Sequence, residues 1–173
     1  MPTWKVQNDM GAAQQASNKN PFRLLMRVPV PWVFVLAYLI GVGLQYAWAP
    51  HPATVALPGV SIAGGVLFGI GAAIACWGLL TFLRARTTTV PGRVSSQLVT
   101  WGPYRFSRNP MYVGLVLAYL GEAGILRQVW PVFLLPLTVA YINWVVIPVE
   151  EEKLKEVFGE DYEQYQARVR RWV

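Results

Sequence analysis

The chain has 173 residues, of which 54% are hydrophobic and only 14% are charged, and its formal net charge is +6. Soluble domains usually carry about 25% charged residues, so this composition points to lipid as the solvent. The single cysteine, Cys76, excludes a disulfide within the chain, and with only one histidine, His51, we expect no metal site.

Four apolar runs follow a polar N-terminal segment, 1–28, and its first 20 residues lack the apolar core of a signal peptide. The runs are Val30–Ala49, Val60–Leu83, Met111–Leu126 and Val129–Val149. Twenty helical residues span about 30 Å, the thickness of the hydrocarbon core, and backbone groups in lipid must be paired within their own segment. The sequence therefore predicts an all-α integral membrane bundle of about four transmembrane helices, with a transmembrane domain at 29–149 that includes a loop at 84–110.

Two features inside the runs predict contacts. Gly65 and Gly69 form a small-xxx-small pattern, which is typical of closely packed membrane helices. Glu122 interrupts the third run roughly 18 Å along the helix, which places it near the far face of the membrane. We expect Glu122 to reach outward or to pair with Arg127, and a polar contact inside the bundle is the alternative.

Basic residues are distributed unevenly between the connections. Under a four-helix topology, fourteen of the fifteen Lys and Arg residues fall on one side of the membrane and only Arg127 falls on the other. Because cytoplasmic loops carry the excess of Lys and Arg, we expect both termini and the loop 84–110 in the cytoplasm. Because the charge follows the membrane topology, it does not indicate nucleic-acid binding.

The C-terminal segment, 150–173, is charged but patterned. Its apolar residues recur every three or four positions, at Leu154, Phe158, Tyr162, Tyr165, Val169 and Trp172. This spacing predicts an amphipathic helix, which Gly159 loosens after two turns. The helix either lies on the membrane surface or folds back over the ends of the bundle, and a solvated structural tail is the alternative.

Most polar side chains lie in the loop 84–110 and in the acidic run Glu150–Glu152. Three adjacent carboxylates repel one another unless cations are near, so one interpretation is an ionic site between the run and the Arg-rich loop, and the other is a solvated face. Arg108 precedes the third helix, where free N–H groups favour an anion, although Arg105 and Arg108 also fit a role as surface anchors. The sequence contains no phosphate-binding loop of the Gly-Lys-Ser/Thr type and no plausible Ser/His/Asp set.

Two sequence blocks resemble those of a known enzyme family. The first runs from Leu98 to Gly114 (LVTWGPYRFSRNPMYVG), and the second runs from Ile147 to Leu154 (IPVEEEKL) and continues to Tyr165. In this order, each beside a membrane helix, they closely resemble the signatures of the isoprenylcysteine carboxyl methyltransferase and phospholipid methyltransferase superfamily. The resemblance covers about residues 80–172.

The resemblance implies a small helical membrane enzyme that uses S-adenosylmethionine and releases S-adenosylhomocysteine. In this family the cofactor lies at the cytoplasmic ends of the helices, so the segment 150–173 would complete the cofactor site. The family's cofactor contacts match Ser96, Gln97, Leu98, Val99, Tyr104, Asn109, Pro110, Met111, Tyr112 and Glu150. Tyr104 or Tyr112 would pack on the adenosine.

The chemistry of the cofactor suggests roles for the other matched residues. Glu150 would bind the ammonium group or the ribose hydroxyls, and Asn109 or a backbone amide would bind the adenine edge. Arg108 is expected to position a carboxylate of the acceptor or of the cofactor. Glu151 is the nearest candidate for a base if the acceptor is an amine or a thiol. Methyl transfer from this cofactor needs no metal and relies on proximity and orientation.

Three positions depart from the family pattern. Asn109 stands where the eukaryotic isoprenylcysteine enzymes have His, and with the compact length it favours a bacterial member in the inner membrane. Val146 and Val149 stand where relatives have Arg, which weakens the case for a prenylcysteine carboxylate. We expect a lipid-like or prenylated acceptor with a carboxylate, amine or thiol. A non-catalytic membrane protein on the same scaffold, or a small transporter subunit, is the alternative.

Overall fold

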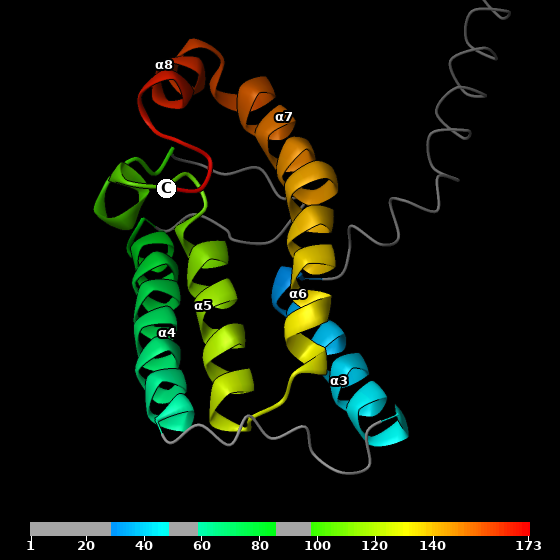
Figure 1. Cartoon of the computed structure of the whole chain (residues 1–173). Helices are drawn as coiled ribbons and strands as arrows, with labels where there is room; N and C mark the ends of the chain where they lie inside the picture. Colours follow the sequence, from blue (N-terminus) through cyan, green and yellow to red (C-terminus); the bar gives the residue numbers. More distant parts are fainter. Residues whose placement is uncertain (1–28, 49–58, 86–97) are drawn as a thin grey trace, which may run out of the picture.

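Helices make up all the regular structure in the part of the chain that the computed structural model describes, which is residues 29–48, 59–85 and 98–173. In chain order they are α3 (Val30–Trp48), α4 (Val60–Arg84), the short 3₁₀ helix η1 (Gly102–Arg105), α5 (Pro110–Ile125), α6 (Trp130–Tyr141), the π turn η2 (Ile142–Val146), α7 (Ile147–Phe158) and α8 (Glu160–Arg168). The expected all-α class is confirmed, and the first three apolar helices begin and end within a few residues of the predicted bounds (Figure 1). The fourth begins as predicted, at Trp130, but continues to Phe158, nine residues beyond the predicted end at Val149. The predicted segment 1–28 lies outside the described residues.

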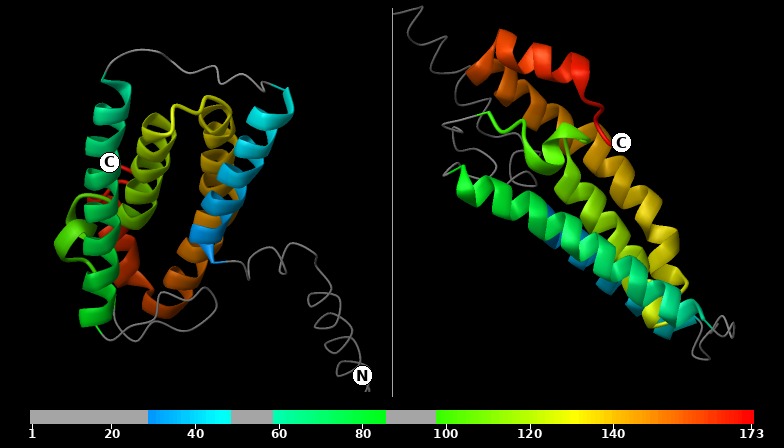
Figure 2. Two further views of the ribbon diagram at one scale, coloured as in Figure 1. Left: turned by 90° about the horizontal axis from the view of Figure 1, so that it is seen from below. Right: turned by 90° about the vertical axis from the view of Figure 1, so that its left-hand side faces the viewer.

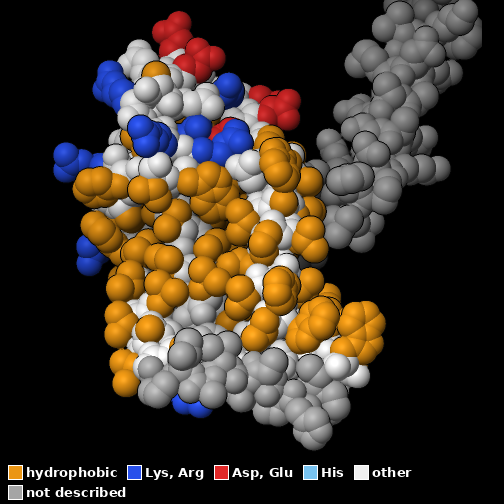
Figure 3. All heavy atoms as spheres, viewed as in Figure 1, with side chains coloured by type: hydrophobic (Ala, Val, Ile, Leu, Met, Phe, Trp, Pro, Cys, Tyr) orange, Lys and Arg blue, Asp and Glu red, His pale blue; other side chains and the backbone are white. Residues whose placement is uncertain are grey.

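Three of the helices are long and apolar enough to cross a membrane. They are α3 with 19 residues, α4 with 25, and the continuous helix Trp130–Phe158 with 29. The fourth, α5, has 16 residues, or about 24 Å, and is therefore shorter than a typical hydrocarbon core. Hydrophobic side chains cover the middle of the molecule, while charged side chains gather at the end that carries α7 and α8 (Figure 3).

Glycines let α4 and α5 pack against each other along their lengths. Gly64, Gly71 and Gly78 are buried and seven residues apart, a spacing that keeps one face of α4 on its neighbour. A Cβ at Gly64 would lie 2.6 Å from the Ile125 nitrogen, so only glycine permits this approach. In contrast, a Cβ at Gly65 or Gly69 would have nothing within 4 Å among the described residues, so the expectation of close packing at this pair is wrong for the helices that the structure describes.

The other helix pair is α3 with α6, and α5 lies between α4 and α6 (Figures 1 and 2). The core around these helices includes Phe34, Tyr38, Tyr119 and Leu135. The Tyr38 and Tyr119 rings meet edge to face at 5.0 Å. Polar contacts join α3 to the start of α6, because the Gln45 Oε1 atom accepts from the amides of Val129 (3.3 Å) and Trp130 (3.4 Å).

The turn between α5 and α6 does not contain the expected ion pair. The Arg127 Nε atom donates to the Ser61 hydroxyl at 3.0 Å, and no ion pair of Glu122 is found among the described residues. Glu122 is half-buried rather than fully exposed. The expectation of a Glu122–Arg127 pair is therefore wrong, because Arg127 turns toward the start of α4.

The C-terminal part of the chain differs from the single amphipathic helix that was expected. Helix α7 continues α6 without a break, so no helix begins at Glu150. Gly159 has φ +51°, a backbone conformation that residues other than glycine rarely adopt, and the chain turns back there into α8. The last residues, Val169–Val173, are not helical and return to the start of α5 (Figure 1), where they also contact η2 and α7.

Candidate functional site

The π turn decides which side of α7 faces the interior. The buried positions of this long helix are Pro131, Leu135, Thr138, Ile142, Ile147 and Glu151. The steps are three or four residues, as in an α-helix, except for the step of five from Ile142 to Ile147. Because the π turn supplies this extra residue, Glu151 faces inward while Glu152 is exposed.

The segment before α5 supplies the facing side chains. It contains η1, where Gly102 has φ +64° and Pro103 follows in the first turn. Tyr104 is buried and meets Phe82 of α4 edge to face at 5.0 Å. The Tyr165 hydroxyl of α8 donates to the Tyr104 carbonyl oxygen at 2.8 Å, so α8 is fixed onto this segment.

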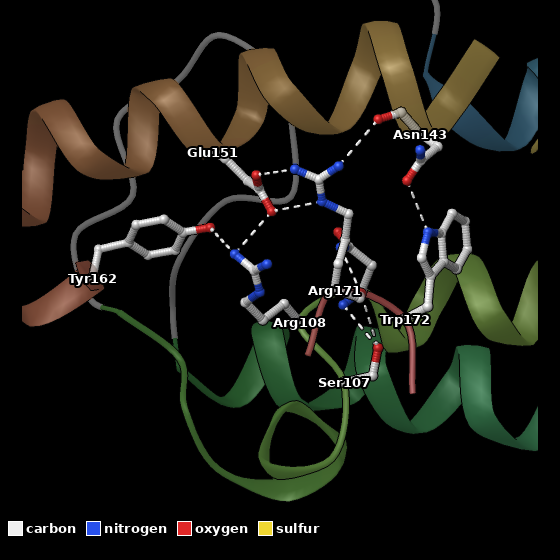
Figure 4. Close-up of polar contacts among 8 residues, drawn as sticks. Ser107, Arg108, Asn143, Glu151, Tyr162, Arg171 and Trp172 are labelled. Atoms are coloured by element: carbon white, nitrogen blue, oxygen red, sulfur yellow. Dashed lines mark hydrogen bonds and ion pairs between the residues drawn. The ribbon is translucent and has the colours of Figure 1, made fainter. Parts of the chain in front are cut away.

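Glu151 lies between two arginines (Figure 4). The Arg108 Nη1 atom is 2.9 Å from the Glu151 Oε1 atom, and both side chains are only 10% exposed. Arg171 binds the same carboxylate with two donors, at 2.6 Å from Nη2 and 3.2 Å from Nε. Such forked contacts are the strongest that an arginine makes with a carboxylate. The site therefore brings together Arg108 and Glu151, which are 43 residues apart in the sequence.

The returning C-terminal segment is held by hydrogen bonds that its main-chain carbonyl oxygens accept from residues at the start of α5 and just before it. The Arg108 amide donates to the Arg170 carbonyl oxygen at 2.9 Å. The Asn109 Nδ2 atom donates to the Arg171 carbonyl oxygen at 2.9 Å, and the Ser107 hydroxyl lies 3.4 Å from the same oxygen. These contacts place Arg171 beside Glu151.

Glu150 has a different partner from its neighbour. The Tyr112 hydroxyl lies 2.8 Å from one oxygen of Glu150 and 2.9 Å from the other. Tyr112 is in the first turn of α5, so this contact joins the start of α5 to α7. Two adjacent carboxylates are thus separated: Glu151 pairs with guanidinium groups, and Glu150 accepts from a phenol.

The tyrosines around the site act as neutral hydroxyls. Burial raises the pKa of Tyr162 and of Tyr165 above the ordinary value for a phenol. The Arg108 Nη1 atom donates to the Tyr162 hydroxyl at 3.5 Å, a long contact. One donor of Arg108 has no partner, since its Nε atom is buried without a hydrogen bond among the described residues.

The expected site residues mostly lie at this end of the bundle. Arg108, Asn109, Tyr112, Glu150 and Glu151 are joined by the contacts above. Tyr104 and Val99 are buried nearby in the same segment, Leu98 is half-buried, and Pro110 and Met111 begin α5, where Met111 packs against Gly78. Ser96 and Gln97 lie outside the described residues.

Sequence reasoning did not assign a site role to Ser107, Asn143, Tyr162, Arg171 or Trp172. Asn143 offered a signal, because it is the one amide side chain within the apolar run Val129–Val149. Arg171 offered none, because it resembles the other basic residues that follow the last transmembrane helix.

Comparison with family models identifies the class of protein to which this fold and this cluster belong. The model described as phospholipid methyltransferase matches residues 60–161, more than half of the chain. The chain therefore belongs to the phospholipid methyltransferase family, which supports a membrane methyltransferase in general and agrees with the resemblance in its sequence. Neither the curated proteins nor the solved structures gave a significant match.

Proposed function

We propose that the chain transfers a methyl group from S-adenosylmethionine to a lipid-like or prenylated acceptor at the membrane. The observation that carries the proposal is the meeting of the two family blocks at one end of the bundle. Glu151 lies 2.9 Å from Arg108, and Glu150 lies 2.8 Å from Tyr112. Both contacts fall within the span that the family model matches.

The residues at this end fit the cofactor's chemistry. The Arg108 Nε atom is a buried donor with no partner among the described residues, which suits an oxygen of a carboxylate such as the cofactor's own. Glu150 is an acceptor for an ammonium group or for ribose hydroxyls, and Tyr104 and Asn109 lie in the adjacent segment. When bound, the cofactor supplies a methyl group activated by a sulfonium, so no metal is required for the transfer.

Each charged residue then has a distinct task. Arg108 orients a carboxylate, and Glu150 holds the cofactor's polar groups. Both oxygens of Glu151 already accept from guanidinium groups, which leaves it poorly suited to remove a proton and well suited to position Arg108. The protein contributes mainly orientation of the two reactants, the contribution that this reaction needs most.

The acceptor is better described as neutral or amine-bearing than as a carboxylate. Arg108 and Arg171 both pair with Glu151, and Val146 and Val149 offer no charge. Because the Arg108 Nε atom is assigned to the cofactor's carboxylate, a second carboxylate on the acceptor would have to compete with Glu151 for a guanidinium group. A lipid headgroup with an amine does not meet this competition.

The site faces the cytoplasm in this proposal, and the membrane is the bacterial inner membrane. The support is the excess of Lys and Arg on the side of the bundle that carries α7 and α8. The cofactor is a polar molecule, and a cytoplasmic site gives it access without crossing the bilayer.

The test is calorimetric titration of the detergent-purified protein with S-adenosylhomocysteine. Glu150→Ala should abolish saturable binding, whereas Glu152→Ala should leave it unchanged, because Glu152 is exposed on the same helix. Binding by the unaltered protein would justify a labelled-methyl assay on lipid extracts. The proposal fails if the folded protein binds no cofactor product in detergent or in a bilayer, or if Glu150→Ala binds normally.

A further inference from the structure

Asn143 lies in the π turn that interrupts the α-helical pattern of the continuous helix Trp130–Phe158. The Ile147 amide donates to the Ile142 carbonyl oxygen five residues earlier, which is the π pattern. The next π donor would be residue 148, but this is Pro148, which has no N–H group. In the α pattern the donor to the Asn143 carbonyl oxygen would be the Ile147 amide, which binds Ile142 instead. In both the α and the π pattern this oxygen therefore lacks a donor from its own helix.

The C-terminal segment supplies the missing partner. The Arg171 Nη1 atom lies 3.4 Å from the Asn143 carbonyl oxygen. The Asn143 side chain also binds this segment, since its Oδ1 atom accepts from the Trp172 indole nitrogen at 3.0 Å (Figure 4). One residue of the π turn thus contacts both neighbours in the returning segment.

These contacts lead to the candidate site through Arg171. The same guanidinium that reaches Asn143 binds Glu151 with its other two nitrogens. Glu151 in turn pairs with Arg108. A hydrogen bond from an uncharged indole to an uncharged amide adds no charge to the site, so its effect is on where Arg171 lies.

We propose that Asn143 is a positioning residue: through Trp172 and Arg171 it holds the C-terminal segment Val169–Val173 in place, and so it aligns Glu151 and Arg108 in the cofactor site. The effect on cofactor binding rests on the function proposed above. The effect on the positions of Glu151 and Arg108 does not, and it can be measured without a ligand. Trp172 and Asn143 are called the latch below. Trp172 and Arg171 lie beyond the span of the family match, which ends at residue 161.

The hydrogen bond of the latch can be removed while an aromatic or branched side chain stays in place. Trp172→Phe keeps an aromatic ring and loses the N–H donor, and Asn143→Leu loses the side-chain acceptor. Asn143→Asp keeps an acceptor oxygen at the same place and lies beside Arg171, which would balance its charge. Trp144→Phe is the matched control, because Trp144 is the next residue on the helix and its side chain is 73% exposed.

Two measurements on the full chain in detergent test the proposal. The first is hydrogen–deuterium exchange of the peptides that contain the Arg108 amide and residues 169–173, without ligand. The second is the affinity for S-adenosylhomocysteine. Trp172→Phe and Asn143→Leu should exchange faster in both peptides and bind about fivefold more weakly, the loss typical of one hydrogen bond. Asn143→Asp and Trp144→Phe should stay within about twofold of the unaltered protein in affinity, a difference of less than one hydrogen bond.

The double variant Asn143→Leu with Trp172→Phe should be no weaker than either single variant, because both remove the same bond. Unchanged exchange and affinity in both single variants would overturn the latch. Faster exchange with unchanged affinity would also overturn the positioning role, since the segment would then be ordered without effect on the site. Failure of the proposed function looks different: the unaltered protein would bind no ligand, while the exchange of the Arg108 peptide would still decide whether the latch aligns that residue.

Discussion

Ile142 and Ile147 are both 0% exposed, although five positions separate them on one continuous helix. In an unbroken α-helix the residue four positions after Ile142 is Val146, and the next on that face is Glu150. The π turn replaces Val146 by Ile147 and Glu150 by Glu151 on the inner face. One additional residue thus determines which of two adjacent acids pairs with Arg108.

An alanine inserted between Trp144 and Val145 should put Glu150 in the place of Glu151 and move Glu151 to the exposed place of Glu152. The insertion rotates α7 by about 100° relative to α6, so Glu150 would face Arg108 and Val149 would face Tyr112. We expect loss of measurable S-adenosylhomocysteine binding in a protein that retains its helical circular dichroism. Deletion of Trp144 is the comparison, because it turns the step of five into a step of four and keeps Glu151 inward. Equal binding by the insertion and the deletion variants would contradict this account.

The helices were predictable from the sequence and the π turn was not. Uninterrupted apolar runs identify membrane helices because their backbone groups can be paired only within the segment. The run Val129–Val149 is apolar on all sides, so hydrophobic periodicity carries no information about its phase. Pro136 and Pro148 indicated an irregular helix, but a proline does not specify where the helix is irregular or whether it kinks or forms a π turn.

Glu151→Gln should weaken the site more than Glu152→Gln. The substitution leaves two guanidinium groups facing a neutral amide, and Arg108 is only 10% exposed. Breaking a buried pair typically costs about 3–5 kcal/mol, and the 32% exposure of the Arg171 side chain places the expected loss near the lower end. Thermal unfolding in detergent measures the stability, and titration with S-adenosylhomocysteine measures the affinity. Because Glu152 is exposed, its variant should match the unaltered protein, and equal losses in both would argue against the pair.

The candidate site was predictable in part, as a meeting of two sequence blocks. The resemblance pointed to Arg108, Asn109 and the paired acids, and these residues do come together. It did not indicate that Glu151 binds Arg171, because that contact depends on the turn at Gly159 and on the return of the chain after α8. Local patterns of hydrophobicity do not encode a nonhelical return of this kind.

Asn109→Asp distinguishes two roles for Asn109, which are to hold the C-terminal segment and to contact the cofactor directly. Its Nδ2 atom donates to the Arg171 carbonyl oxygen at 2.9 Å, and a carboxylate would place two acceptors together there. The start of α5 would favour the new negative charge by about 0.3–1 kcal/mol, which is less than the roughly 1–3 kcal/mol lost with an unsatisfied buried group. We therefore expect weaker cofactor binding and faster amide exchange in 169–173. Weaker binding with unchanged exchange would instead assign Asn109 a direct contact with the cofactor.

Gly64→Ala and Gly65→Ala should have opposite consequences despite being neighbours. A Cβ at Gly64 would lie 2.6 Å from the Ile125 nitrogen and 2.7 Å from the Gly121 carbonyl oxygen, so α4 and α5 would have to separate. Overpacking of this kind typically costs about 1–3 kcal/mol. A Cβ at Gly65 meets nothing within 4 Å, and alanine favours the helix over glycine by about 1 kcal/mol. Thermal unfolding in the same detergent should therefore show a lower midpoint for Gly64→Ala and an equal or higher one for Gly65→Ala. A lower midpoint for Gly65→Ala alone would place the close contact on the other face of α4, against the packing described for α5.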